Sequence, residues 1–117
     1  MIKMAAALIM VLTAYTNCDP GMRCDGVMAS GVQTFDGAVA CGSAFEFGTR
    51  FCVPALGRCF ICQDRGSAIG DNRLDIWMAD RSQALEFGRQ ELEAILPWGR
   101  PDSRNKEELW TNYTRLF

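Results

Sequence analysis

The sequence contains no histidine, and this absence excludes several kinds of chemistry at once. Serine–histidine–aspartate triads, histidine-ligated zinc sites and imidazole pH switches all need that side chain. An excess of charge is missing too, because 12 Lys and Arg stand against 14 Asp and Glu, a formal net charge of -2. Without a basic surplus to neutralise phosphates, we expect no nucleic-acid partner. Any acid–base chemistry must therefore use carboxylates, thiols, tyrosine or lysine.

Long apolar runs are also missing. Residues 1–12 carry one lysine and then an apolar stretch, which resembles a short signal peptide. The stretch is shorter than the roughly 20 apolar residues that a membrane-spanning helix needs, so we expect no stable membrane span. No small-x-small cleavage site follows before Thr13, and we expect the stretch to be retained as the first strand.

Cysteine, by contrast, is abundant, with six in 117 residues. Six reduced thiols in the core are one interpretation, and an oxidising compartment with disulfides is the one we favour. Cys18 and Cys24 enclose turn residues, as do Cys52 and Cys59, so we expect at least one disulfide, with Cys18–Cys24 as the first candidate and Cys52–Cys59 as the second. Cys59 and Cys62 have CxxC spacing, but residues three apart on a strand point to opposite faces. We therefore expect no metal site and no cofactor.

Eleven glycines separate short apolar stretches, a pattern typical of a compact β-barrel. The stretches cover residues 8–15, 27–28, 38–41, 49–53, 58–63 and 74–78. One helix is predicted over residues 81–88, because Asp80 can cap its start, with Gln83 three residues on, and Gly88 can close it. Strict alternation over residues 91–95 predicts a final strand that ends at Pro97.

The predicted domain is a mainly β barrel over residues 1–96, followed by a C-terminal extension over residues 97–117. Residues 107–117 have the apolar spacing of an amphipathic helix. Two interpretations of the extension remain open: a strap over the barrel, or a docking element for a protein partner.

The candidate site is the stretch from Asp64 to Asp75, in which one aspartate ends a predicted strand and the other enters the next. Gly66 and Gly70 between them permit a tight loop that returns the chain to the same face of the barrel. Taken alone, two aspartates around a glycine-rich loop are more often turn formers than catalysts.

Five motifs in order resemble the three-aspartate, or 3D, domain. They are TAYT at 13–16, MASG at 28–31, FGT at 47–49, DRGSAIGDNRLD at 64–75 and ALEFG at 84–88. That domain is a double-psi β-barrel found in the membrane-bound lytic transglycosylase A family and in resuscitation-promoting or spore-associated murein enzymes. The resemblance runs from about residue 12 to 96 and implies a six-stranded double-psi barrel with one short helix.

The resemblance also implies site residues. The two later aspartates of the family lie in the substrate cleft, the last being the usual catalytic acid, and these positions fall on Asp64 and Asp75. The first aspartate has no counterpart, because residues 39–43 read VACGS. We expect Asp64 to raise the pKa of Asp75 by its charge, with Arg65 and Arg73 opposing that shift if they point inward.

The expected function is cleavage of peptidoglycan glycan strands of the lytic transglycosylase type. One aspartate can suffice there, because the 6-hydroxyl of the muramic acid is the nucleophile and one residue acts first as acid and then as base. Thr13, Tyr15, Ser30 and Gly66 are candidate substrate-binding residues, although Tyr15 fits core packing equally well.

Two other functions remain open, namely a non-catalytic cell-wall-binding barrel and a structural or assembly subunit such as a phage virion component. The expected location is outside the cytoplasm, either in the cell envelope or secreted, or in a phage virion.

Overall fold

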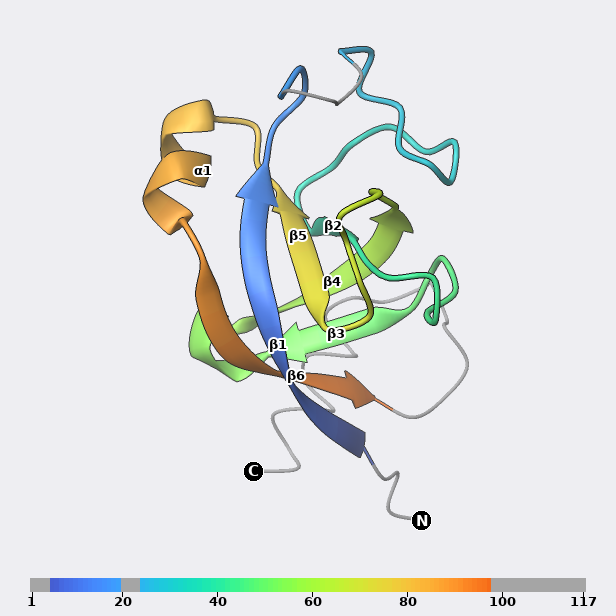
Figure 1. Cartoon of the computed structure of the whole chain (residues 1–117), viewed down its shortest axis with the longest axis vertical. Coiled ribbons are helices and arrows are strands. Elements are labelled where there is room, and N and C mark those ends of the chain that lie inside the picture. The colour runs from blue at the N-terminus through green and yellow to red at the C-terminus, as the bar shows by residue number, and fades with distance from the viewer. Residues whose placement is uncertain (1–4, 20–23, 98–117) are drawn as a thin grey trace.

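The computed structural model describes residues 5–19 and 24–97. Within them six strands close into a barrel in the order β1-β5-β2-β4-β3-β6 (Figure 1). The elements are β1 (Ala5–Tyr15), β2 (Ala38–Ala40), β3 (Arg50–Val53), the short 3-10 helix η1 (Pro54–Leu56), β4 (Arg58–Asp64), β5 (Arg73–Trp77), α1 (Arg81–Phe87) and β6 (Gln90–Pro97). The predicted mainly β fold is confirmed. The stretch predicted at 27–28 forms only an isolated bridge between Val27 and Gln33, because it belongs to a small loop and not to the barrel.

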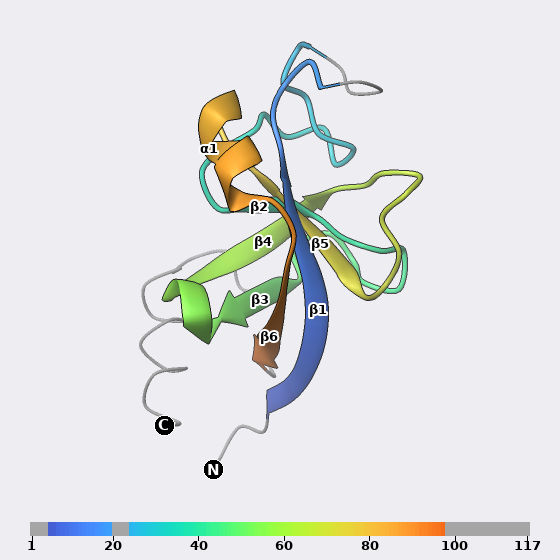
Figure 2. The ribbon, with the colours of Figure 1, turned by 60° about the vertical axis from the view of Figure 1, so that its left-hand side comes forward.

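The long first strand organises the barrel. β1 runs parallel to β5 on one side and antiparallel to β6 on the other, and two views show it between these neighbours (Figure 1, Figure 2). Ala5 pairs with Pro97, so the two ends of the barrel chain meet as strand partners. Strand alternation directs Met10 and Leu12 into the core, whereas Ile9, which precedes Met10, points outward and is 67% exposed.

The core is filled by inward-facing side chains from all six strands. Its buried members are Met10, Leu12, Val39, Cys41, Phe51, Val53, Phe60, Cys62, Leu74, Ile76 and Ala94. The rings of Phe45 and Phe51 meet edge to face with centroids 5.0 Å apart. Fully burying an aliphatic or aromatic side chain of this size contributes about 1.5–3 kcal/mol, so this cluster is the main source of the barrel's stability.

Three disulfides join the six cysteines. Cys18–Cys24 and Cys52–Cys59 are the two predicted pairs, and Cys41–Cys62 is a third that the sequence analysis did not predict. Cys62 lies in the core while Cys59 pairs with Cys52 in a second cluster, so the CxxC cysteines do point to opposite faces. Three disulfides indicate a protein that matures outside the reducing cytosol.

The predicted helix is confirmed as α1. The Asp80 side chain caps it by accepting a hydrogen bond from the Ser82 backbone N–H at 2.8 Å, and Gly88 closes it with a positive φ of 64°. α1 packs against β1. No helix in residues 5–19 and 24–97 is long and apolar enough to cross a membrane. The predicted C-terminal extension lies beyond the described residues.

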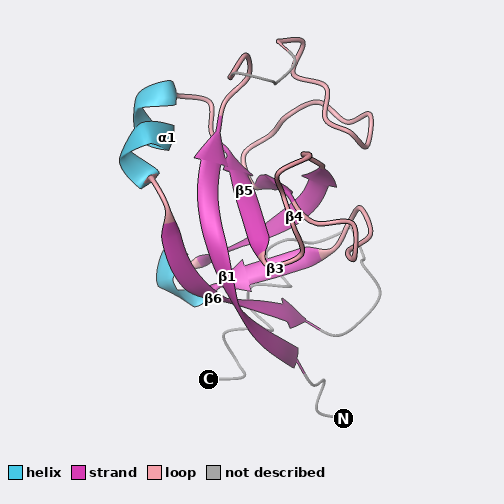
Figure 3. Ribbon diagram, in the orientation of Figure 1, coloured by secondary structure: helices cyan, strands magenta, loops and turns pink. Residues whose placement is uncertain are grey.

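The loops that matter for the site gather near the ends of β1, β4 and β5. The connection from β1 to β2 rises above the end at which the β1 and β5 arrows finish (Figure 3). Within this connection the Thr34 backbone N–H donates to the Gly26 carbonyl at 2.8 Å. This hydrogen bond closes residues 26–34 into a small hairpin-like loop, called here the 26–34 loop.

Candidate functional site

Strand register places the two aspartates in one row across four adjacent strands. Asp75 on β5 pairs with Thr13 on β1 and, on its other side, with Ala40 on β2. Ala40 in turn pairs with Asp64 on β4, because a register shift after Val39 passes over Gln63. The row therefore reads Thr13, Asp75, Ala40, Asp64.

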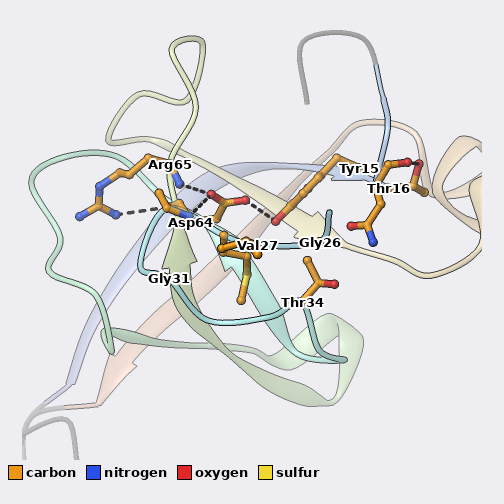
Figure 4. Close-up of a pocket in the computed structure, with 11 residues that line it drawn as sticks. Tyr15, Thr16, Gly26, Val27, Gly31, Thr34, Asp64 and Arg65 are labelled. Atoms are coloured by element: carbon orange, nitrogen blue, oxygen red, sulfur yellow. Dashed lines mark hydrogen bonds between the residues drawn. The ribbon is translucent and has the colours of Figure 1, made fainter. Parts of the chain in front are cut away.

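Asp64 is buried and accepts three hydrogen bonds. Its side chain, 6% exposed, accepts from the Tyr15 hydroxyl at 2.8 Å on Oδ2 and from the backbone N–H groups of Ala29 and Arg65 at 2.9 Å on Oδ1 (Figure 4). Hydrogen bonds to a carboxylate are among the stronger ones in proteins. Asp64 thus joins the end of β1, the 26–34 loop and the start of the β4–β5 loop.

Tyr15 is the uncharged partner in this group. Burial raises the pKa of its hydroxyl far above the ordinary value, and the hydrogen bond to Asp64 and the charges of Asp64 and Asp75 raise it further. At neutral pH the phenol is therefore uncharged, and its O–H donates a hydrogen bond to Asp64.

Asp75 has a different environment. It is half-buried, and its Oδ1 accepts from the Thr13 hydroxyl at 2.8 Å. Burial is the largest influence and raises its pKa above the ordinary 3.8, while the Thr13 hydrogen bond and the charge of Arg73 lower it. Asp19 and Asp64 add smaller upward contributions, and burial prevails. Asp75 is therefore a carboxyl group that keeps a proton to higher pH than an exposed aspartate.

The two arginines of the motif point to different partners. Arg73 donates from Nε and Nη2 to the Thr13 hydroxyl oxygen, both at 3.1 Å, so its charge does face the aspartate row. Arg65 turns away: its guanidinium lies 4.3 Å from the centroid of the Phe47 ring and contacts both sulfurs of the Cys41–Cys62 disulfide. The Arg65 side chain therefore packs on the disulfide that joins the end of β2 to β4, and only the Arg65 backbone N–H contacts the Asp64 carboxylate.

A pocket of about 410 Å³ opens beside Asp64 (Figure 4). It is lined by Tyr15, Thr16, Asn17, Gly26, Val27, Met28, Ala29, Gly31, Thr34, Asp64 and Arg65. Of the predicted site residues, this lining brings together Tyr15 and Asp64. Thr13 and Asp75 belong to the same row as Asp64 but are not among the residues that line the pocket.

The remaining predicted binding residues lie at the edge of this region. The Ser30 backbone N–H donates to the Gln63 carbonyl at 3.1 Å, and its hydroxyl accepts from the Val32 N–H at 3.4 Å. Ser30 thus fastens the 26–34 loop to β4. Gly66 is exposed in the β4–β5 loop, where an added Cβ would lie 2.9 Å from the Ile69 side chain.

Asp71 lies in the β4–β5 loop between the two aspartates of the motif, and the sequence assigned it no role. Its Oδ1 accepts from the Ala44 backbone N–H at 3.0 Å. A Cβ on Gly42 would lie only 2.2 Å from that oxygen and 2.6 Å from the Asp71 Cα, so no larger residue fits there unless the β4–β5 loop moves. This close approach restricts position 42 to glycine while the β4–β5 loop keeps its path.

Among the residues that the structure describes, no group of three or more histidine, cysteine, aspartate or glutamate side chains could hold a metal ion. All six cysteines are consumed in disulfides.

The fold and the row define a class of protein: a disulfide-bonded six-stranded barrel with a pair of unequal carboxyl groups at one end. Residues 39–96 match the family model described as the 3D domain. The chain therefore carries a 3D domain, as its motifs indicated, and this family is associated with peptidoglycan-active enzymes. The matched range includes Asp64 and Asp75, while Thr13 and Tyr15 precede it. A comparison with curated proteins finds no match.

Proposed function

We propose that this protein cleaves peptidoglycan glycan strands by lytic transglycosylation, with Asp75 as acid and then as base. The observation that carries the proposal is the environment of Asp75, a half-buried carboxyl with a raised pKa and one hydrogen bond, in the same row as Asp64. The 3D domain supports a cell-wall substrate.

In the proposed reaction, Asp75 gives its proton to the glycosidic oxygen as the bond from that oxygen to C1 of the muramic acid breaks. The 6-hydroxyl of the same sugar then attacks C1, and the Asp75 carboxylate takes the hydroxyl proton. The products are a 1,6-anhydro end and a free 4-hydroxyl, and Asp75 is returned in its protonated form. No water and no second nucleophilic carboxylate are needed, unlike in ordinary glycosidases.

Asp64 has a supporting role in this proposal. Its two oxygens already accept three hydrogen bonds, so it is poorly placed to exchange a proton with a substrate. Its carboxylate instead holds Tyr15 and the 26–34 loop around the pocket. That pocket is of a size for part of a glycan strand next to the bond that is cleaved.

The test is the Asp75→Asn variant on purified sacculi. Asn preserves the shape and can still accept from Thr13, but it has no transferable proton. Release of anhydro-muropeptides should fall about a hundred- to ten-thousand-fold, the usual contribution of a positioned acid or base. Asp71→Asn is the matched control, because Asp71 is an exposed aspartate four positions earlier. Equal release by wild type and a folded Asp75→Asn variant would refute the assignment.

A wall-binding role is the second candidate, favoured by the absence of an acid in residues 39–43 and by the full engagement of Asp64. Wild type that binds sacculi in a pull-down but releases no anhydro-muropeptides would establish it. Both roles place the protein in the cell envelope or among secreted proteins. A virion role would instead need stable co-purification with a particle protein through residues 98–117.

A further inference from the structure

We infer that Arg73 is a positioning residue that acts through Thr13 to fix which oxygen of Asp75 carries the transferable proton. The inference rests on the proposed role of Asp75 and adds two residues to it. Its basis is a chain of three hydrogen bonds that runs from a guanidinium through one hydroxyl to the carboxyl group.

The Thr13 hydroxyl has no freedom in this chain. A hydroxyl oxygen carries one proton and two lone pairs. Arg73 offers only donors, and its Nε and Nη2 both lie 3.1 Å from the Thr13 oxygen, one for each lone pair. The Thr13 proton must then point to its remaining partner, Asp75 Oδ1, at 2.8 Å. Thr13 therefore donates to Asp75 in every protonation state of the carboxyl group.

This obligatory donation decides where the acidic proton sits. In a neutral carboxyl group the carbonyl oxygen is the better acceptor, so Oδ1 becomes the carbonyl oxygen and the proton resides on Oδ2. When that proton leaves, Thr13 still stabilises the anion at Oδ1, and Oδ2 is free to take up the next proton. One oxygen thus serves both steps of the proposed reaction. Because its hydroxyl is fully engaged, we assign Thr13 to positioning Asp75 and not to binding substrate.

Thr13 also separates the Arg73 guanidinium from the Asp75 carboxyl group, so that the two do not form a direct ion pair. Among the described residues, no ion pair joins Arg73 to Asp75, and their contact runs through the hydroxyl. The other charged groups that act on Asp75 are Asp19, which follows β1, and Asp64 on β4. β2 contributes the uncharged Ala40. A direct arginine–carboxylate pair would hold Asp75 ionised, whereas the inserted hydroxyl transmits orientation with only part of the charge effect.

The first arm of the test needs no substrate. The carboxyl carbon of Asp75 is titrated by NMR in wild type, Arg73→Met and Arg73→Lys. Met has a similar length without charge, so the Asp75 midpoint should move to higher pH. Lys keeps the charge but not the two-pronged donor, so its midpoint should stay near that of wild type. An unchanged midpoint in Arg73→Met would overturn the inference, and Arg73→Gln, which also lacks the charge, takes its place if Arg73→Met does not fold.

The second arm measures murein cleavage in a double-mutant cycle. Arg73→Met should lower kcat about tenfold, the rate equivalent of one hydrogen bond, and move the alkaline limb of the pH profile upward. In a Thr13→Val background the same change should not lower kcat further, because the hydrogen-bond path to Asp75 is already cut. Thr13→Ser should retain wild-type rates. Additive losses would show that Arg73 does not act through Thr13.

The two arms separate this inference from the proposed function. If wild type releases no anhydro-muropeptides, the function fails, yet the NMR titration still decides whether Arg73 controls Asp75. If wild type is active and Asp75→Asn is inactive, but Arg73→Met changes neither the midpoint nor the rate, the function stands and the positioning role is wrong.

Discussion

Asp64 and Asp75 are the same residue type in one row of the barrel, and their neighbours give them opposite properties. Asp64 meets three donors and is bound to structure on three sides. Asp75 meets one donor, and burial raises its pKa. A carboxyl group that is held partly out of water without full compensation costs stability in its charged form. This difference leads to two predictions at the scale of single residues.

Asp75→Asn should stabilise the protein at neutral pH. Because the folded-state pKa of Asp75 lies above its unfolded value near 3.8, the stability that Asp75 provides is complete at acid pH and is lost as pH rises through the folded-state pKa. Asn stays neutral and avoids that loss. Urea unfolding at pH 7 should therefore favour the variant, and the difference should shrink when the measurement is repeated below pH 3.8. A variant that is less stable than wild type at both pH values would contradict this.

Asp64 should tolerate Asn far better than Ala. Asn keeps an oxygen for the N–H groups of Ala29 and Arg65 and changes only the contact with Tyr15, at a cost of about 1 kcal/mol. Ala leaves the buried Tyr15 hydroxyl and the Ala29 N–H without their acceptor and should cost about 3 kcal/mol or more. Chemical denaturation of both variants measures the gap. Equal losses would mean that the carboxylate oxygens do not organise these segments.

At the scale of elements, the Cys41–Cys62 disulfide is the feature closest to the site. It joins the end of β2 to β4 two residues before Asp64, and both of its sulfurs contact Arg65. Cys52–Cys59 instead closes the turn between β3 and β4, in a small cluster outside the main core. The two bonds therefore offer a matched comparison within one barrel.

Replacing Cys41 and Cys62 together with Ala should destabilise the protein by about 3 kcal/mol, against about 2 kcal/mol for the Cys52 and Cys59 pair, because the longer loop regains more entropy when unfolded. Thermal or urea unfolding tests this order. Murein cleavage should fall only in the first variant, since only that bond supports the segment around Asp64. Equal activity in both variants would show that the Cys41–Cys62 disulfide does not support the site.

These elements also show how far the sequence was informative. Local signals led to correct predictions of the helix and of two disulfides. Asp80 and Gly88 bounded the helix, and turn residues identified Cys18–Cys24 and Cys52–Cys59. Cys41–Cys62 was missed because its partners are 21 positions apart and meet only through parallel pairing of β2 with β4. Pairing over such distances depends on strand register, which no local pattern specifies.

The same limit applies to the site. Motif resemblance selected Asp64 and Asp75, and the order of the strands brings them into one row. The inward direction of Arg73 and the approach of Asp71 to Gly42 depend on rotamers and loop paths that follow from packing. These contacts are therefore properties of the folded structure that the local sequence does not specify.

At the scale of the whole molecule, the pairing of Ala5 with Pro97 means that the barrel begins and ends at the same place. The two chain ends of such a domain leave it from adjacent positions. A domain with adjacent ends can be inserted into a loop of a larger protein, because the two sides of the host loop need not move apart to join it.

The same geometry permits a circular permutant. A short glycine–serine linker would join residue 97 to residue 5, and new termini would open at the exposed Pro54–Ala55 step, whose flanks stay tied by Cys52–Cys59. We expect this single chain of residues 5–97 to show the circular dichroism of the parent and to retain three disulfides by intact mass. If it folds only when residues 98–117 are appended, the extension is part of the folding unit, and the barrel is not the modular insert that its adjoining ends suggest.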